Sequence, residues 1–343
     1  MTSLSNNRID AGSTIVWLED VNRNLTWLVG GKAAGLGELL KAGIPVPPAF
    51  CVTTTAYRDF VKESGLARQI REIISGIKFE NEAEITSISN RILKLFNQSE
   101  LTDKIASQIL LASKQLTGRA HSDSRIESRF AVRSSAITED LKAASFAGQH
   151  SSFLNIKEGT GLLQATKKCF ASLYTPKAIV YRSRNRISQT DVAMAVIVQK
   201  MIQARVAGVM FSVHPATGNQ SQIVIEGNWG LGESVVGGMV TPDEFVIDKQ
   251  TLSVLSRHVA SKSIEIAAKA EDNGTYSRKL QGDKARVPCL NDSELSALAS
   301  LAIRIERYFG APQDIEWVIK ADLHPPENIF IVQSRPITTL PSP

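Results

Sequence analysis

The spacing of apolar residues predicts helices in the first third of the chain. Residues 25–43 begin with a glycine-rich turn and continue with leucines at helical spacing, and Gly43 stands where such a helix would end. A short apolar strand is predicted over 50–52 and a helix over 55–63. Residues 66–118 carry further amphipathic helical patterns. We therefore expect this region to serve packing more than chemistry.

From about residue 130, short segments rich in β-branched residues predict buried strands. The predicted strands cover residues 130–132, 192–198, 207–213, 222–225, 244–247, 252–258, 314–319 and 329–335. A helix over 293–309 precedes the last two strands, and Gly310 stands just beyond its end. Helical and strand-rich regions in one chain predict an α+β fold with two lobes, which we expect to join near residues 199–202.

The last two predicted strands would bring polar side chains together. Strict alternation over 314–319 puts the apolar residues on one face and Asp314 and Glu316 on the other. Gln333 and Arg335 share a face of the next strand. If the strands pair, a carboxylate, an amide oxygen and a guanidinium converge, a combination that suits Mg²⁺ held together with substrate phosphates. A solvated polar face of a sheet is the alternative that the spacing leaves open.

Two earlier segments have residue types that bind phosphate. A predicted helix follows Gly30, Gly31 and Lys32. The glycines let an anion approach the backbone closely, and the first N–H groups of the helix and the charge of Lys32 can then face it. The spacing is not that of a Walker loop, and a purely structural turn is the alternative. Arg133 follows the strand over 130–132, where its forked guanidinium can bind a phosphate. A surface arginine is the alternative there.

Two further segments gain meaning only in context. The small-residue loop 145–149, which contains Gly148 and Gln149, can fold over a ligand, although in isolation it is only a turn. The predicted strand before Gln199 and Met201 is apolar, and the residues that follow it are abruptly polar. Backbone polar groups at such a crossing between lobes can face the edge of an adenine.

Composition bounds the class of protein. The 343 residues suffice for one large domain or two moderate ones, and 43% apolar and 21% charged residues are ordinary for a soluble globular protein. No apolar run approaches the roughly 20 residues of a membrane helix, and the polar first 13 residues do not resemble a secretory signal. Three well-separated cysteines suggest neither a disulfide framework nor a zinc site. We therefore expect a cytoplasmic protein without a membrane segment.

The net charge of +5 would suit an anionic ligand or partner. Basic residues are scattered, except at Arg182, Arg184 and Arg186, for which we predict a solvated helix end. The aromatic residues, 6% of the chain, are not interleaved with Lys and Arg as in a platform that stacks single-stranded bases. We do not expect nucleic acid binding.

Seven motifs, taken together and in order, resemble the N-terminal ATP-binding domain shared by phosphoenolpyruvate synthase, pyruvate phosphate dikinase, rifampicin phosphotransferase and phenylphosphate synthase. The motifs occupy residues 30–36 (GGKAAGL), 132–135 (VRSS), 145–149 (SFAGQ), 207–211 (AGVMF), 228–233 (NWGLGE), 313–317 (QDIEW) and 333–337 (QSRPI). The resemblance covers nearly the whole chain, from about Gly30 to Thr338.

The resemblance implies an ATP-grasp-like fold that holds ATP and Mg²⁺ between two lobes, residues 1–198 and 199–343. It implies that Lys32 and Arg133 contact phosphates and that Arg335 braces the transferred group. Residues implied to touch or cover the nucleotide are Gly30, Gly31, Gly148, Gln149, Gln199 and Met201, and those implied to bind Mg²⁺ are Glu316 and Gln333.

The resemblance also implies that the β-phosphoryl group passes to a histidine on a mobile domain, which leaves AMP and phosphate. In the family this histidine follows a Gly-Gly pair, but neither such pair here has a histidine four residues on. His214, at which relatives often have an acidic or amide residue, is expected to be a loop residue near the site. Because the chain ends at Pro343, just after the last motif, we expect a partner subunit or domain to carry the phosphohistidine.

Three functions stay open at this point. The leading one is the ATP-binding subunit of a split phosphotransferase, similar to the smaller subunit of phenylphosphate synthase, with phenol or another small molecule as the final acceptor. The second is the ATP-binding domain of a single-chain phosphoenolpyruvate synthase or antibiotic phosphotransferase. The third is a non-catalytic ATP sensor, against which the complete set of implied phosphate and metal residues argues.

Overall fold

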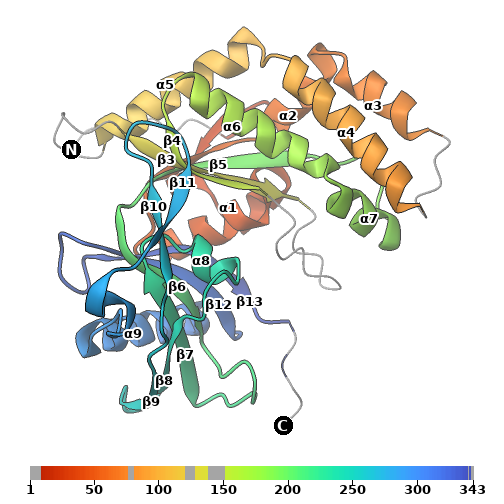
Figure 1. Ribbon diagram of the computed structural model, residues 1–343. Coiled ribbons are helices and arrows are strands. Elements are labelled where there is room, and N and C mark those ends of the chain that lie inside the picture. Colours follow the sequence, from red (N-terminus) through yellow and green to blue (C-terminus); the bar gives the residue numbers. More distant parts are fainter. Residues whose placement is uncertain (1–8, 76–80, 120–127, 138–150, 339, 341–343) are drawn as a thin grey trace. The chain divides into compact units, whose positions relative to one another are not determined.

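The chain forms two compact units (Figure 1). The first consists of Met1–Ala34 and Pro48–Lys200, and the second of Gly35–Pro47 and Met201–Pro343. This computed structural model describes residues 9–75, 81–119, 128–137, 151–338 and 340. The observed division differs from the predicted one at 198/199, chiefly because a short segment of the N-terminal region belongs to the second unit. Helix α1 (Thr26–Lys41) therefore begins in the first unit and ends in the second.

The first unit is built on a five-stranded antiparallel sheet with the order β1-β2-β5-β3-β4. Its strands are β1 (Ile15–Trp17), β2 (Ala49–Val52), β3 (Arg129–Ala136), β4 (Ser152–Lys157) and β5 (Met194–Lys200). Its further helices are α2 (Thr54–Glu63), α3 (Leu66–Ile74), α4 (Glu82–Gln98), α5 (Asp103–Arg119), α6 (Thr160–Ala171) and α7 (Pro176–Arg184), with short 3₁₀ turns at Leu18–Asp20, Arg23–Leu25 and Ser172–Tyr174.

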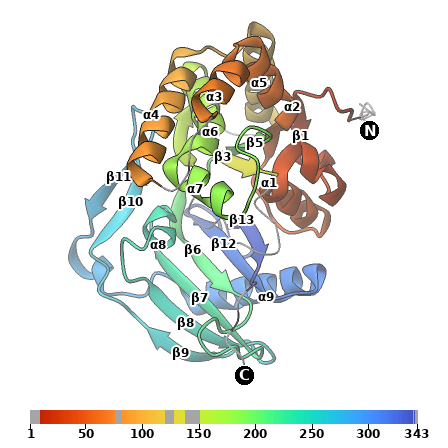
Figure 2. The same ribbon diagram turned by 90° about the vertical axis from the view of Figure 1, so that its right-hand side faces the viewer.

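The two faces of this sheet have different neighbours because side chains alternate along each strand. Phe130, Val132, Val196 and Val198 point into the main hydrophobic core, which helices α2, α4, α5 and α6 also line. Helix α4 packs against α3, α6 and α7 in this layer (Figure 2). Residues of the opposite parity face the start of α1, whose backbone contacts Ser135 of β3.

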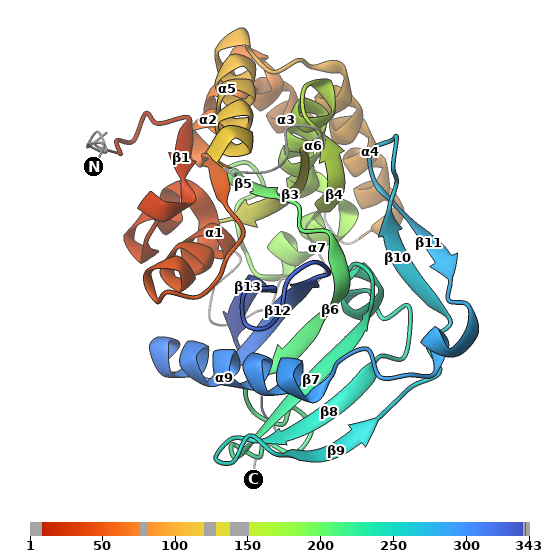
Figure 3. The ribbon, with the colours of Figure 1, turned by 90° about the vertical axis from the view of Figure 1, so that its left-hand side faces the viewer.

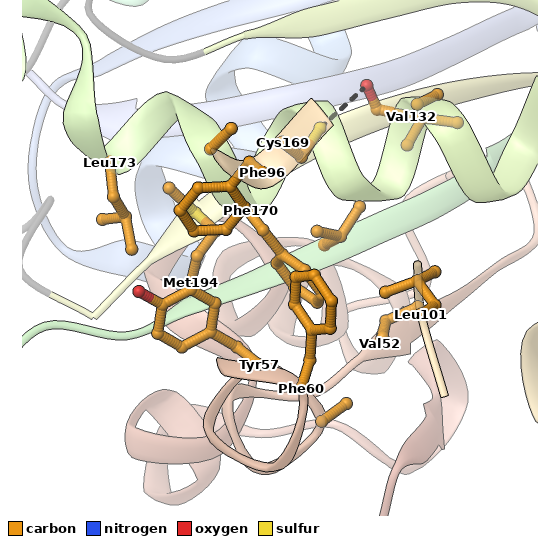
Figure 4. Packing of buried hydrophobic residues seen from close by; sticks show 14 of the residues in the cluster. Val52, Tyr57, Phe60, Phe96, Leu101, Val132, Cys169, Phe170, Leu173 and Met194 are labelled. Atoms are coloured by element: carbon orange, nitrogen blue, oxygen red, sulfur yellow. Dashed lines mark hydrogen bonds between the residues drawn. The ribbon is translucent and has the colours of Figure 1, made fainter. Parts of the chain in front are cut away.

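Aromatic side chains from α2, α4 and α6 fill the centre of the core (Figure 4). The ring centroid of Phe60 lies 6.0 Å from that of Phe96 and 6.0 Å from that of Phe170. Tyr57 makes an edge-on contact with Phe170 at 5.3 Å, and its hydroxyl lies 3.2 Å from the hydroxyl of Tyr174. Helices α4 and α5 lie within 66–118, which the sequence pattern predicted as a packing region, and that prediction is confirmed for them. Helix α6, which supplies Phe170, was not predicted.

Arg182 is buried, so the predicted solvated helix end is wrong at this residue. The side chain is 1% exposed, its Nε donates to Oε1 of Gln189 at 2.9 Å, and its guanidinium lies 5.6 Å from the centre of the Tyr174 ring. Burial lowers the pKa of Arg182, and the nearby tyrosines oppose that shift. Arg184 and Arg186 are exposed as predicted. The three arginines look alike in sequence, yet α7 points Arg182 and Arg184 in different directions, and Arg186 lies beyond the helix end.

Lys167 of α6 caps the C-terminus of α4. Its Nζ donates to the carbonyl oxygens of Asn97 at 3.2 Å and Ser99 at 2.6 Å, and the residue is 8% exposed. We expect Lys167→Met, which keeps the aliphatic stem, to lower the free energy of unfolding by about 1.5–3 kcal/mol, the range for hydrogen bonds to a charged group. Urea unfolding measures this loss.

The matched control is Lys168→Met at the next, exposed position of the same helix. A surface substitution of this kind should stay within about 0.5 kcal/mol of the unchanged chain. Equal losses in the two variants would contradict the capping role of Lys167.

The second unit is built on a six-stranded antiparallel sheet with the order β13-β12-β6-β7-β8-β9. Its strands are β6 (Ala204–Phe211), β7 (Gln222–Trp229), β8 (Asp243–Asp248), β9 (Val254–His258), β12 (Gln313–Lys320) and β13 (Ile329–Pro336). A separate hairpin pairs β10 (Ile264–Ala268) with β11 (Thr275–Lys279), and the helices are α8 (Glu233–Val236), α9 (Asp292–Phe309) and a 3₁₀ turn at Gly282–Ala285.

Helix α9 lies across one face of this sheet (Figure 3). Its start has a capping box, in which the Asn291 side chain accepts from the Glu294 N–H and Glu294 accepts from the Asn291 N–H. It ends at Gly310, whose φ of 70° is left-handed. The predicted helix over 293–309 is thus confirmed to within one residue at its start.

The face of β12 that turns toward α9 is apolar, as predicted. Ile315, Trp317 and Ile319 are 0% exposed, and the indole of Trp317 fills the space beside two glycines of the neighbouring strands. A Cβ added at Gly208 would lie 2.8 Å from the indole, and one added at Gly227 would lie 3.1 Å from it. The large ring therefore requires the glycines opposite it.

Residues 35–47 join the second unit through contacts with α9 and β13. Arg304 of α9 donates to the carbonyl oxygens of Ala42 and Gly43 at 3.4 and 3.3 Å. The N–H of Ile331 in β13 donates to the carbonyl oxygen of Pro45 at 2.8 Å. Gly43 has a left-handed φ of 67° and closes α1, which confirms the helix end predicted there.

None of the helices in the described part of the chain combines the length and the apolar character that a bilayer-spanning helix requires. The three cysteines are free and buried. Burial raises the pKa of the Cys51 thiol to about 12 and that of Cys169 well above its usual range.

Candidate functional site

The glycine-rich segment of α1 is held against β3 by a close backbone contact. Gly30 has φ 75° and ψ 167°, which kinks the helix. A Cβ at this position would lie 2.2 Å from the carbonyl oxygen and 2.4 Å from the hydroxyl of Ser135. Only glycine satisfies both the left-handed φ and this contact. The predicted turn at Gly30 is present, although the helical run begins before it and resumes directly after it.

The residues after Gly30 begin a new stretch of helix, so their N–H groups lie at a helix start. The Ala33 N–H donates to Oγ of Ser135 at 3.2 Å. Nζ of the half-buried Lys32 lies 3.4 Å from the carbonyl oxygen of Ser134. A lysine beside a kinked, glycine-bounded helix start is the arrangement that binds anions.

Arg133 and Gln199 belong to the same face of the first sheet as Ser135. In the register of β3 and β5, Arg133 pairs with Ile197 and Ala131 pairs with Gln199, which makes Arg133 and Gln199 diagonal neighbours. They are 9% and 2% exposed. Together with the segment of α1 that contacts Ser135, the first unit thus gathers Gly30, Gly31, Lys32, Arg133 and Gln199 at one face of its sheet.

In the second unit the last two predicted strands pair, which was the condition for their polar side chains to converge. In the antiparallel register of β12 and β13, Glu316 stands directly opposite Gln333, and Asp314 stands directly opposite Arg335. Glu316 and Asp314 are both half-buried and face away from α9. A carboxylate and an amide oxygen therefore lie side by side, and the carboxylate–guanidinium pair lies two residues along the same face.

Asp314 has a partner that the sequence did not assign to it. Its Oδ2 accepts from Nε of Arg335 at 2.8 Å and from Nη2 at 2.6 Å. The side chain of Asp314 is 16% exposed and that of Arg335 is 43% exposed. The carboxylate orients the guanidinium, because a fork of two donors on one acceptor fixes its plane. The alternation along β12 had already placed Asp314 on this face. That alternation was the signal by which Asp314 could have been counted among the site residues.

Glu226 of β7 is a further carboxylate on this face that sequence reasoning missed. Across the sheet, Glu316 pairs with Val209, Val209 with Glu226, and Glu226 with Glu244. Burial raises the pKa of Glu226, and the carboxylates of Glu244 and Asp314 raise it further. The predicted strand ended at residue 225, so no alternation was read through Glu226.

The raised pKa of Glu226 predicts a pH-dependent stability. The folded state binds this proton more tightly than the unfolded state, so the group contributes stability that is full below its ordinary pKa of 4.5 and is lost as pH rises through the folded value. Glu226→Gln, which cannot ionise, is expected to raise Tm at pH 7 and to leave it unchanged at pH 4. Thermal unfolding at the two pH values checks this, with the exposed Glu271→Gln as a control. An equal shift at both pH values would contradict it.

The chemistry of the donor set fits Mg²⁺ bound jointly with phosphates. Glu316 and Gln333 supply hard oxygen ligands at neighbouring positions. Among the residues that the structure describes, no group of three or more His, Cys, Asp and Glu side chains could hold a metal by itself. Such a sparse oxygen set is characteristic of Mg²⁺, which completes its shell with water and substrate phosphate oxygens.

The remaining predicted site residues are placed as follows. Met201 is half-buried and belongs to the second unit, whereas its neighbour Gln199 belongs to the first. Gly148 and Gln149 lie outside the described residues. His214 lies in the loop after β6, as predicted, and its Nδ1 accepts from the Ala216 N–H at 3.3 Å.

Comparisons with known proteins agree with this geometry. Residues 26–342 match the family described as "Pyruvate phosphate dikinase, AMP/ATP-binding domain". The chain is 40% identical over 340 residues to a probable phosphoenolpyruvate synthase of Methanocaldococcus jannaschii, with 99% of this chain and 28% of that protein covered. It is 41% identical over 348 residues to the phosphoenolpyruvate synthase of Aeropyrum pernix, with 94% and 42% covered.

The chain therefore spans less than half the length of these curated relatives. The family match extends from the kinked helix with Lys32 to the strand with Gln333 and Arg335, so it includes both groups of polar residues described above. The chain belongs to the pyruvate phosphate dikinase AMP/ATP-binding domain family.

Proposed function

We propose that the chain is the Mg-ATP-binding part of a phosphoenolpyruvate synthase-type phosphotransferase. It would have an ATP-grasp-like arrangement, with the nucleotide bound between the two units. The observation that carries the proposal is the register of β12 and β13, which sets Glu316 opposite Gln333 and Asp314 opposite Arg335 in a chain of an AMP/ATP-binding family. The relatives named phosphoenolpyruvate synthase supply the reaction type.

The polyphosphate would be bound by residues from both units. Lys32 and Arg133 would neutralise phosphate charge, and the backbone at Gly30 and Gly31 would let the phosphates approach the helix start. Arg335, oriented by Asp314, would brace the transferred group. Phosphoryl transfer needs charge neutralisation and alignment more than covalent help from the protein, and these residue types supply both.

Glu316 and Gln333 would hold Mg²⁺, which when bound neutralises charge that develops on the phosphate oxygens. Gly148 and Gln149 would belong to the loop that covers the phosphates. The adenine would lie along Gln199 and Met201, at the point where the chain passes from the first unit to the second. Gln199 is buried, and its carboxamide can both donate and accept hydrogen bonds, as the edge of an adenine does.

The acceptor of the β-phosphoryl group would be a histidine on a separate domain, either in the same polypeptide or in a partner subunit, and AMP and phosphate would be the products. Two observations support this arrangement. Neither Gly-Gly pair is followed by a histidine at the spacing of the family's carrier residue. The relatives are also at least twice as long as the region that this chain matches.

Labelled ATP tests the proposal. The chain is incubated with Mg-ATP that carries label at either the β or the γ position, with and without a histidine-bearing domain of a relative. We expect AMP and a β-labelled phosphohistidine only when that domain is present. Pyruvate and phenol are then added as final acceptors, and the names of the relatives favour pyruvate; transfer to phenol alone would favour a phenylphosphate synthase-like split enzyme. Rapid label transfer by the chain alone to a small molecule would contradict the proposal.

Glu316→Ala and Gln333→Ala are expected to weaken the Mg²⁺-dependent part of ATP binding by about 1.5–3 kcal/mol each, because each removes an oxygen ligand beside the phosphates. Adenosine binding and ATP binding in EDTA should change little. Calorimetric titrations with and without Mg²⁺ measure the difference. Glu327→Ala, in the exposed link between the same two strands, is the control. An unchanged Mg²⁺ dependence would leave these two residues as ordinary members of the sheet.

A further inference from the structure

Helix α1 is fixed at both ends by different partners. Its first part is held in the first unit, where Ala33 and Lys32 contact the Ser135 hydroxyl and the Ser134 carbonyl. Its second part is held in the second unit. The helix has its kink at Gly30, and the run that follows is continuous to Lys41. The orientation of Lys32 therefore depends on what holds the later turns of the same helix.

One side-chain anchor of these later turns is a hydrogen bond between Tyr308 of α9 and Glu38. The Tyr308 hydroxyl donates to Oε2 of Glu38 at 2.8 Å. The carboxylate is largely buried, since Glu38 is 9% exposed, and Nζ of Lys41 lies 3.8 Å from its other oxygen. A buried carboxylate requires donors, so the hydroxyl fixes both the side chain and the turn of helix that bears it.

Backbone contacts on either side of Glu38 limit how this part of α1 can move. Gly35 lies close to the backbone of β13, and a Cβ built there would be 3.6 Å from the carbonyl oxygen of Ser334. Ser334 lies between Gln333 and Arg335 in the chain. At the helix end, Arg304 holds the carbonyl oxygens of Ala42 and Gly43. Tyr308 and Arg304 lie one turn apart on α9, and their hydrogen bonds go to successive turns at the end of α1.

The geometry of the helix connects this anchor to Lys32. Glu38 follows Lys32 by six positions, which is about 9 Å along a helix at 1.5 Å per residue. At 3.6 residues per turn, the two side chains point about 120° apart. The Glu38 anchor therefore fixes the rotation of the helix without occupying the side from which Lys32 projects.

We propose that Tyr308 is a positioning residue for Lys32. By holding Glu38, its hydroxyl sets the rotation of α1 and thus the direction in which the Lys32 ammonium meets the phosphates. The inference rests on the proposed function, because it assumes that Lys32 binds the phosphates of ATP. Tyr308 itself touches no substrate in this scheme.

Tyr308→Phe in the full chain tests the inference, because it removes one hydroxyl from a residue that is 39% exposed and leaves the ring in place. We expect the affinity for Mg-ATP to fall by about three- to tenfold, a fraction of the effect of removing the Lys32 charge. The affinity for adenosine, which has no phosphates, should not change. Tyr276→Phe, at another exposed tyrosine of the second unit, is the matched control.

Two further variants separate positioning from general stability. Glu38→Gln keeps an oxygen acceptor for the Tyr308 hydroxyl and should retain most of the ATP affinity, whereas Glu38→Ala should resemble Tyr308→Phe. The double variant Lys32→Ala/Tyr308→Phe should bind ATP no more weakly than Lys32→Ala, because a positioning residue acts only through the group it positions.

An unchanged ATP affinity in Tyr308→Phe, an equal loss for ATP and adenosine, or a full additional loss in the double variant would each overturn the inference while leaving the proposed function intact. An unchanged chain that fails to bind Mg-ATP would contradict the proposed function and this inference with it.

Discussion

Replacing Lys32 with alanine is expected to weaken ATP binding by about 1.5–3 kcal/mol, or roughly 10- to 150-fold. The ammonium lies 3.4 Å from the Ser134 carbonyl oxygen, beside the kink that Gly30 makes against Ser135. A phosphate at this helix start would gain a charge-assisted hydrogen bond from Lys32, and alanine would remove it without disturbing the kink. Calorimetric titration with ATP, AMP and adenosine measures the effect, which should grow with the number of phosphates.

Arg133→Ala is expected to weaken ATP binding by a similar amount, because the Arg133 guanidinium belongs to the same face of the first sheet. Lys62→Ala is the control for Lys32, since it removes an exposed lysine from the last turn of α2. Circular dichroism must accompany the titrations, because Arg133 is 9% exposed and its loss can disturb β3. If Lys32→Ala bound ATP as tightly as Lys62→Ala, Lys32 would not be a phosphate ligand.

Gly208→Ala is expected to lower the free energy of unfolding by about 3 kcal/mol or more, although it adds only one methyl group. An added Cβ would lie 1.9 Å from the carbonyl oxygen of Glu226 and 2.8 Å from the Trp317 ring. The carbonyl belongs to the neighbouring strand β7, so relief requires β6 and β7 to separate and their hydrogen bonds to lengthen. Urea unfolding, followed by tryptophan fluorescence, measures the loss.

Gly232→Ala is the matched control, because a Cβ there would meet only the Cβ of Ala207 at 3.6 Å, an ordinary contact. Its backbone is right-handed, with φ −67°, which alanine adopts without strain. We expect Gly232→Ala to change the free energy of unfolding by less than about 1 kcal/mol. Comparable losses in the two variants would mean that the strands around Gly208 adjust more easily than their spacing indicates.

The sequence predicted best where one physical signal decides the structure. Alternation over 314–319 predicted β12 and both of its faces correctly, because one face is sealed by α9 and the other is polar. Gly43 and Gly310 marked two helix ends, because both have the left-handed φ that L side chains avoid. β12 and β13 do pair, and this pairing was the condition for the convergence of their polar side chains.

Other features depended on contacts that no local pattern carries. The burial of Arg182 depends on Gln189 and on Tyr174, which a helical pattern around residue 182 does not reveal. Glu226 and Glu316 lie on one face of the sheet with Val209 of β6 between them, an arrangement that depends on the strand order. Segment 35–47 was assigned to the wrong unit, because its partners in α9 and β13 lie far along the chain.

The placement of residues 35–47 has a consequence for the order in which the protein is made. The carbonyl oxygen of Pro45 accepts a hydrogen bond from the Ile331 N–H. Pro45 leaves the ribosome about 290 residues before Ile331 does. At about 5–20 residues per second, that interval is roughly 15–60 s. During it, Leu36, Leu39 and Ile44, all buried in the finished fold, belong to a segment whose partners in α9 and β13 have not yet been made. The first unit can assemble meanwhile, so this apolar segment would stay without its partners until α9 and β13 have been made. A chaperone that binds exposed hydrophobic stretches could bind it during that time.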